Sequence, residues 1–251
     1  MIISGMIWYT RDDGASVTTH VAASAGGESV APAPGGSANQ PPAAQDLLTA
    51  FNGYAKQIGI DQAKFQQCLG KQENGQVINK HLQRGTQLGV NGTPTFFINN
   101  KKIVGAQPGA IFDEVIAAEL KGSPTTLAAY SANVQQLAAT DPPRFEILPS
   151  KVDVSDAQIE GNPGAKVMIA EFSDFQCPFC KQWTDQNLKR IRSQEGNDVA
   201  LAFLHFPITQ IHPNAGNASV AAMCAGEQGK FWPMHDLLFS RQQEWENLRA
   251  N

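Results

Sequence analysis

The sequence is poor in cysteine, in charge of one sign and in long apolar runs. Four cysteines among 251 residues are too few for a fold built on disulfides, and a chain of this length can bury a core without them. The formal net charge of -4, with acidic and basic residues interspersed, gives no electrostatic reason to expect nucleic acid as a partner. Composition therefore indicates a globular protein of one large domain or two small ones.

No apolar stretch at the start of the chain is long enough to cross a bilayer. The stretch from Met1 to Thr10 is interrupted by Ser4 and Gly5, whereas a spanning helix needs ~20 apolar residues. It also lacks the basic segment and cleavage site of a signal peptide. These residues could be the remnant of an anchor, so the pattern alone leaves export open.

The next segment contains little that could form a core. Residues 12–45 are rich in alanine, glycine, serine and proline, which bury too little apolar surface to become ordered. We therefore predict that residues 1–45 are a disordered stub and tether, and that structure begins near Asp46.

Residues 46–120 read as helices followed by a hairpin and a last helix. A helix is predicted from the N-cap Asp61 to Gly70, and a longer one over 76–88. Two short β-type runs separated by Asn-Asn then indicate a hairpin over 95–104, and apolar spacing predicts a helix after Pro108.

Residues 121–150 are predicted to be a connector, with one helix around 127–138 and a break at Pro142-Pro143. Connecting sequence continues to Gly164. The segment 151–251 then opens on an apolar strand at Val167–Phe172. After it we expect a helix to about Arg192, a strand over 199–206, and helices over 213–225 and 229–240. The two halves show no internal repeat.

Two cysteines form the motif Cys177-Pro178-Phe179-Cys180, directly after the apolar strand. If the motif opens a helix, unpaired backbone N–H groups stabilise a thiolate at the first cysteine. The pKa of a thiol in such a motif can fall to ~3.5–7.5. Cys177 is then expected to be the exposed nucleophile and Cys180 the buried resolving thiol, and Pro178 suits the first helical turn.

Half of a zinc site is the competing interpretation of this motif. A structural zinc site needs a second cysteine or histidine pair of similar spacing. Cys68 and Cys224 each stand alone in the sequence, so redox chemistry is favoured and no metal site is predicted.

Five segments have a recognisable pattern: Glu171–Cys180, Phe206-Pro207, His212–Ala215, Cys224–Trp232 and Gly92–Asn99. In these segments the chain resembles DsbA-like thioredoxin-fold proteins, particularly their membrane-tethered bacterial branch. The resemblance covers most of 46–120 and 145–248, and Gly92–Asn99 is similar to the cis-proline loop of that family.

The resemblance implies roles for individual residues. Pro94 matches the cis-proline beside the dithiol, against the alternative of an ordinary trans turn, and Thr93 matches the residue whose backbone pairs with substrate. Glu171 matches a partly buried acid that could relay protons to the resolving thiol, or could be only a surface-facing or paired strand carboxylate. Pro178 and Phe179 match the dipeptide that tunes the redox potential and faces substrate.

Cys68 and Cys224 also match positions at which some relatives carry cysteine. Both would lie on helices of one helical subdomain, where a second, structural disulfide could form. The alternative is a pair of buried free thiols that behave as small apolar side chains.

The order of the segments departs from the family. There the dithiol segment comes first and the cis-proline loop last, whereas here the loop half, 46–120, precedes the dithiol half, 151–251. A circular permutation, a piece of a tandem array and a mis-joined gene would each explain this order. We favour a single permuted domain, because the connector is long enough to span one.

The resemblance therefore implies an α/β thioredoxin-like sheet with a helical insertion. The implied activity is thiol-disulfide exchange with cysteine-containing proteins, and a second protein would reset the dithiol. No cofactor is implied. The implied location is outside the cytoplasm, in the periplasm or cell envelope, with a membrane tether upstream as an option. A reductase or isomerase, or a non-catalytic metal- or partner-binding module, is the alternative.

Overall fold

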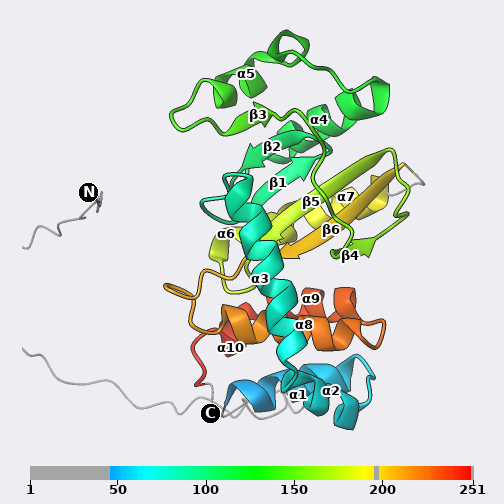
Figure 1. Ribbon diagram of the computed structural model, residues 1–251, viewed down its shortest axis with the longest axis vertical. Helices are drawn as coiled ribbons and strands as arrows, with labels where there is room; N and C mark the ends of the chain where they lie inside the picture. The colour runs from blue at the N-terminus through cyan, green and yellow to red at the C-terminus, as the bar shows by residue number, and fades with distance from the viewer. Residues whose placement is uncertain (1–45, 195–197, 250–251) are drawn as a thin grey trace, which may run out of the picture. The chain divides into compact units, whose positions relative to one another are not determined.

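A six-stranded mixed sheet forms the centre of the structure. The computed structural model describes residues 46–194 and 198–249, so the predicted tether lies outside the described part. The strands lie in the order β3-β2-β1-β5-β6-β4. Their bounds are β1 Thr95–Ile98, β2 Lys101–Val104, β3 Phe145–Ile147, β4 Gln158–Glu160, β5 Val167–Ser173 and β6 Val199–His205 (Figure 1).

Strands from both halves of the sequence meet in this sheet. β1 and β2 form the predicted hairpin, and β1 also pairs antiparallel with β5, with Phe96 opposite Glu171. β5 then runs parallel to β6, with Ser173 in register with His205. Since β5 and β6 are buried along nearly their whole length, they need cover on both faces.

Helices supply that cover and build a separate layer. The helices are α1 Leu47–Gln57, α2 Gln62–Leu69, α3 Gln72–Gln87, α4 Gly109–Lys121, α5 Ala132–Ala138, α6 Pro178–Trp183, α7 Lys189–Gln194, α8 Ala215–Gly226, α9 Phe231–Ser240 and α10 Gln242–Trp245. Short 3-10 and π-helical turns lie at η1 Leu127–Ala129 and η2 Thr184–Leu188. In Figure 1, α3 runs from the layer of α1, α2, α8 and α9 up to the sheet.

Three apolar clusters hold these layers together. One lies between the sheet and α4, α6 and α7, with Trp183 packed on Phe96 and Phe112. A second lies on the opposite sheet face, beneath the end of α3 and the segment 148–159. The third fills the helical layer and reaches Phe175, Cys177 and Cys180. The dithiol therefore lies where the sheet meets the helical layer.

Close packing of α3 on the sheet depends on a glycine. A Cβ atom at Gly85 would come within 2.7 Å of the Phe206 ring and 3.0 Å of Phe172. Because real Cβ contacts are longer than this, only glycine lets α3 approach the sheet so closely at this point.

The connector contributes to the fold more than the sequence indicates. β3, inside the predicted connector, pairs with β2 at one edge of the sheet, and β4 pairs with β6 at the other. Tyr130, Val134 and Phe145 are buried in the cluster beneath α4. Each of the two strands has only three residues, too few for an alternating pattern to stand out. The helix predicted over 127–138 is η1 and α5 instead of one continuous helix.

One ion pair is fully buried at the hairpin. The Lys101 ammonium lies 2.7 Å from the Glu119 carboxylate, and neither side chain is exposed. Asn99 Nδ2 donates a hydrogen bond to Glu119 Oε2 at 2.8 Å, and Lys101 Nζ donates to Ser123 Oγ at 3.2 Å. These partners compensate for removing both charges from water.

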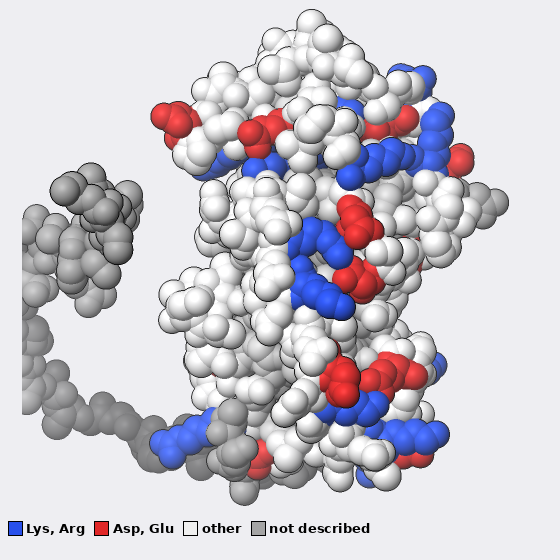
Figure 2. Space-filling model, viewed as in Figure 1, with Lys and Arg blue, Asp and Glu red and all other residues white. Residues whose placement is uncertain are grey.

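Other charges lie at the surface and mix in sign. On the face drawn in Figure 2, basic and acidic groups lie beside one another. Three of the ion pairs are Arg84 with Asp156, Lys71 with Glu227, and Arg192 with Asp236. This face offers no extended basic patch of the kind that nucleic acid needs.

Candidate active site

The Cys177–Cys180 motif lies at a junction between strand and helix. β5 ends at Ser173, Asp174–Gln176 form a short link, and Cys177 is the N-cap of α6, with Pro178 in the first turn. The Lys181 backbone N–H donates to the Cys177 carbonyl at 3.1 Å, which closes that turn. The sequence folds this way because the apolar strand stops at polar Asp174 and proline is tolerated at the start of a helix.

The loop before β1 lies against this motif. The Thr93-Pro94 peptide bond is cis, and Pro94 is buried. Cys177 Sγ donates to the Thr93 carbonyl oxygen at 3.4 Å, although the two residues are 84 apart in sequence. One chain therefore brings the predicted substrate-pairing residue to the predicted nucleophile.

The exposure expected for Cys177 is wrong. Only 4% of Cys177 is accessible, because the Thr93-Pro94 loop and Phe175 pack around it, and Cys180 is fully buried. The exposed part of the motif is the dipeptide between the thiols. Pro178 is exposed, and 60% of Phe179 is accessible.

The two thiols differ in acidity. The hydrogen bond from Cys180 contributes most to lowering the Cys177 pKa to about 6. Burial opposes this shift, while the Thr93 side chain and the backbone N–H groups of Cys180 and Phe179 add to it. Burial is the first cause that raises the pKa of Cys180 well above its usual range, and the neighbouring Cys177 and Glu171 raise it further. The pair thus has one thiolate-forming and one proton-holding member.

We expect the reduced protein to be alkylated at Cys177 with a midpoint near pH 6, about 2 to 3 pH units below a free thiol. The thiolate is the form that reacts, and the hydrogen bonds that it accepts stabilise it at a lower pH than in a free thiol. Iodoacetamide rates against pH, with peptide mass spectrometry to locate the label, measure this midpoint. A midpoint near pH 8.5 would contradict the assignment, and Cys180 should remain unlabelled in the folded protein.

Glu171 lies under the dithiol on β5. It is 4% exposed, more deeply buried than the sequence indicates. Burial raises the pKa of its carboxyl to about 7, and the Cys177 charge adds to the shift. The group can therefore hold or release a proton near neutral pH.

Asp174 organises the surroundings of the motif, and sequence reasoning did not assign it a role. It is fully buried, and its carboxylate accepts from Gln176 N at 2.8 Å, Ile208 N at 2.8 Å and His212 Nδ1 at 2.7 Å. Gln176 Oε1 in turn accepts from Asn214 N at 2.8 Å. The only signal in the sequence was the presence of an acid three residues before Cys177.

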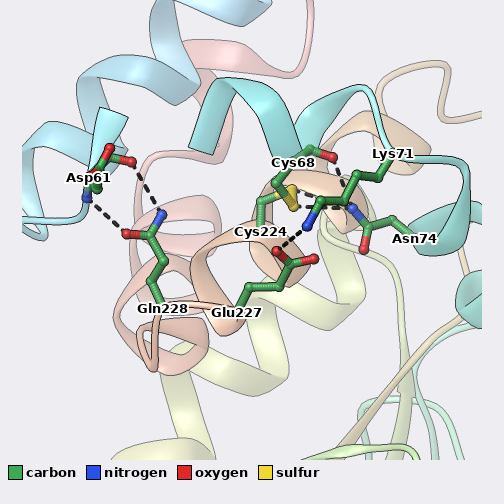
Figure 3. Close-up of a disulfide and its surroundings, with 7 residues drawn as sticks. All are labelled: Asp61, Cys68, Lys71, Asn74, Cys224, Glu227 and Gln228. Carbon is green, nitrogen blue, oxygen red and sulfur yellow. Dashed lines mark hydrogen bonds and ion pairs between the residues drawn. A yellow bond between two sulfur atoms is a disulfide. The ribbon is translucent and has the colours of Figure 1, made fainter. Parts of the chain in front are cut away.

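The other two cysteines form a disulfide in the helical layer. Cys68 on α2 and Cys224 on α8 are bonded, with Cα atoms 5.6 Å apart (Figure 3). Asn74 on α3 is buried and directs Nδ2 at the Cys68 carbonyl and at both sulfur atoms. Outside the bond, Lys71 pairs with Glu227 at 2.7 Å. This bond joins the two halves of the sequence.

Replacing Cys68 and Cys224 together with alanine should lower the free energy of unfolding by about 2–5 kcal/mol. The residues are 156 apart, so the cross-link removes many conformations from the unfolded chain. Urea unfolding of both proteins, in a background without Cys177 and Cys180 to prevent thiol exchange, measures the difference. Equal midpoints would show that the bond does not stabilise the fold.

The histidines have structural surroundings. His205 and His235 are buried among phenylalanines, where burial lowers the pKa of both. In the part of the chain that the structure describes, no group of three or more histidine, cysteine or acidic side chains is placed to hold a metal ion. Among the same residues, no helix has the length and apolar character needed to cross a membrane.

Two family models match the chain, one in each half. A DSBA-like thioredoxin domain matches residues 38–117, and a thioredoxin model matches residues 154–251. Both describe the fold seen here, with the dithiol in one matched region and the cis-proline loop in the other. Both halves of the chain are thus similar to thioredoxin-fold families, and the first half matches a DSBA-like thioredoxin domain.

The curated proteins that are similar to part of this chain are named as sodium/proton antiporters. The chain is 34% identical over 99 residues to the Na(+)/H(+) antiporter NhaA 1 of Mycolicibacterium gilvum, which is 39% of this chain and 16% of that protein. It is 39% identical over 93 residues to the Na(+)/H(+) antiporter NhaA 3 of Salinispora tropica, 37% of this chain and 14% of that protein. The matched stretch is thus about a sixth or less of each relative.

Proposed function

We propose that this protein exchanges disulfides with cysteines of exported proteins through Cys177 and Cys180. The observation that carries the proposal is the dithiol itself. An acidic thiol at a helix start lies on the carbonyl of a cis Thr93-Pro94 bond, beside a buried thiol of much higher pKa. The DSBA-like thioredoxin model supports thiol-disulfide oxidoreductase chemistry in general.

In the oxidising direction, a substrate thiolate attacks Cys177 Sγ of the Cys177–Cys180 disulfide. The substrate–Cys177 bond forms as the Cys177–Cys180 bond breaks, and Cys180 leaves as a thiolate that takes a proton. A second substrate thiolate then attacks the substrate sulfur, which releases the substrate disulfide and the Cys177 thiolate. The low Cys177 pKa makes that sulfur a good leaving group and favours this direction.

Substrate would approach on the side of the exposed dipeptide. The Thr93 backbone beside cis Pro94 would pair with an extended peptide, and the exposed Pro178 and Phe179 would contact its side chains. Glu171 would accept or supply protons for Cys180 from beneath.

We also propose that the domain is circularly permuted, with residues 46–120 as the back half and 151–251 as the front half. Support comes from the meeting of the two described ends: Leu47 N donates to the Arg249 carbonyl at 3.1 Å. Segments adjacent in an unpermuted relative would therefore be adjacent in space here. Residues 121–150 would join the opposite ends while supplying β3.

We infer the cellular location of the protein from its proposed chemistry. Disulfide exchange of this kind operates where disulfides persist, so we place the protein outside the cytoplasm, in the periplasm or cell envelope, with a membrane tether upstream as an option. A redox partner protein would reoxidise the dithiol. Ion transport is not proposed, because the name of the antiporters belongs to proteins of which the match covers a small share.

The test is exchange by the intact protein in both directions. Oxidised protein is mixed with a peptide that carries two cysteines, and reduced protein with the oxidised peptide. Glutathione buffers then give the potential of the dithiol. Rapid peptide oxidation with a potential near or above about -180 mV supports an oxidase, whereas one near about -270 mV supports the reductase alternative. No exchange above the rate of the peptide alone would reject the function.

A further inference from the structure

Gln242 is a buried glutamine that the proposed chemistry has not used. It is the first residue of α10, and only 3% of it is accessible. Its Nε2 donates to the Phe175 carbonyl at 2.7 Å and to the Cys177 carbonyl at 3.2 Å. Since both partners are carbonyl oxygens, the amide must present its NH2 end to them. One side chain therefore holds the two peptide groups that flank the pair Gln176-Cys177.

The packing of α10 fixes the place of this amide. Trp245, on the same short helix, is fully buried. Its ring lies 5.6 Å from that of Phe51 on α1, measured between centroids, and its Nε1 donates to the Leu238 carbonyl on α9 at 2.9 Å. The helical layer thus anchors α10, so the Gln242 amide is held independently of the loop that it contacts.

Gln176 adds a second link between this loop and the same segment. It is buried, and its Nε2 donates to the Glu246 carbonyl at 2.8 Å. The residue before Cys177 is therefore also tied to the segment 242–248. Gln242 differs from Gln176 in that it bonds to the Cys177 backbone itself.

The orientation of the Cys177 peptide group matters for the thiolate. Cys177 is the N-cap of α6, with an extended backbone, and its Sγ lies 3.4 Å from the Thr93 carbonyl oxygen. The carbonyl that Gln242 binds also accepts from Lys181 N at 3.1 Å, which closes the first turn. If this peptide group rotated, Sγ would move relative to the N–H groups at the start of the helix, which stabilise a thiolate.

From these contacts we propose that Gln242 is a positioning residue for the dithiol, because it fixes the Cys177 backbone and holds Sγ at the start of α6. The inference rests on the proposed dithiol exchange and names a residue that keeps its nucleophile in place. Gln242 acts through Cys177 and does not contact substrate. The titratable groups that interact with Cys177 are Cys180 and Glu171, and the variants below leave both unchanged.

Gln242→Met removes both hydrogen bonds and keeps a side chain of similar length. In the reduced variant, the midpoint of Cys177 alkylation against pH should rise by about one unit, a tenfold loss of thiolate relative to thiol. At pH 7 the equilibrium with glutathione should shift about fivefold toward the Cys177–Cys180 disulfide, because that state contains no thiolate to stabilise. Iodoacetamide rates and glutathione titrations measure the two effects.

A matched control separates positioning from packing. Asn74 is also a buried amide, and it donates to the Cys68 carbonyl at 3.1 Å, at the other cysteine pair. Asn74→Leu should lower the urea midpoint, as Gln242→Met does, because each leaves a buried carbonyl without a donor. Only Gln242→Met should shift the Cys177 alkylation midpoint. If that variant does not fold, Gln242→Asn keeps the amide with a shorter reach and should shift the midpoint in the same direction.

Two results would overturn the positioning role alone. One is a Gln242→Met protein with a lower urea midpoint but the wild-type alkylation midpoint, which would make the glutamine a packing residue only. The other is an equal shift of the alkylation midpoint in Asn74→Leu, which would trace the effect to general loosening of the fold. A wild-type protein that exchanges no disulfide with a peptide would instead reject the proposed function, and the positioning role with it.

Discussion

Replacing Cys177 with serine should reduce disulfide exchange to the rate of the substrate alone. The hydroxyl of serine is not ionised near neutral pH, so it cannot replace the thiolate that a pKa of about 6 provides. Replacing Cys180 with serine should have a different effect. Cys177 would still attack, and the mixed disulfide would accumulate because no second thiol resolves it.

Peptide oxidation rates and mass spectrometry of trapped adducts measure both effects. The matched control is the Cys68→Ala, Cys224→Ala protein, which lacks the other cysteine pair and should exchange at the wild-type rate per folded molecule. If the Cys177→Ser protein keeps its activity, or if adducts form on Cys68 or Cys224, the wrong pair has been assigned.

Replacing Lys101 with methionine should lower the free energy of unfolding by about 3–5 kcal/mol. Lys101 and Glu119 lie 2.7 Å apart with no exposed surface, so removing the ammonium leaves a carboxylate buried without its counter-charge. Asn99 would still donate to it, but one amide does not offset a lost cation. The shift in urea midpoint at constant slope measures the loss.

Two companion proteins test the cause. Changing Glu119 to leucine in the Lys101→Met protein should recover much of the loss, since no charge then remains buried. Lys71→Met breaks the exposed pair with Glu227 and should cost about 1 kcal/mol or less. If Lys101→Met and Lys71→Met lower the free energy of unfolding by the same amount, burial is not the reason that the Lys101–Glu119 pair stabilises the fold.

The strongly patterned parts of the fold could be predicted from the sequence. Two β-type runs on either side of Asn-Asn predict the hairpin over 95–104, which the structure contains. At this turn Asn99 has a positive φ of 54°, a conformation that asparagine tolerates. The β5 and β6 strands were visible as apolar runs. β3 and β4 were not, because three residues at the edge of a sheet take their conformation from their neighbours.

The positions of the candidate site residues could be predicted from the sequence, but their burial and their contacts could not. The motif located Cys177 and Cys180, and the Thr93-Pro94 resemblance located the loop that lies on them. The sequence could not show that this loop leaves Cys177 only 4% exposed. It could not single out Asp174 either, because the role of this carboxylate depends on long-range packing of the segment 207–214, which no local pattern records.

The pairing of β1 with β5 makes the order of synthesis matter. Thr93 leaves the ribosome 84 residues before Cys177, which at 5–20 residues per second is roughly 4–17 s. During that time β1 has only β2 beside it, and its other edge is open to any passing strand. Cys68 also emerges before Cys177 and Cys180, and meets both before its own partner Cys224 exists. Until β5 and the last helices are made, the open β1 edge and the unpaired Cys68 are therefore the two points at which the growing chain is exposed to wrong pairing.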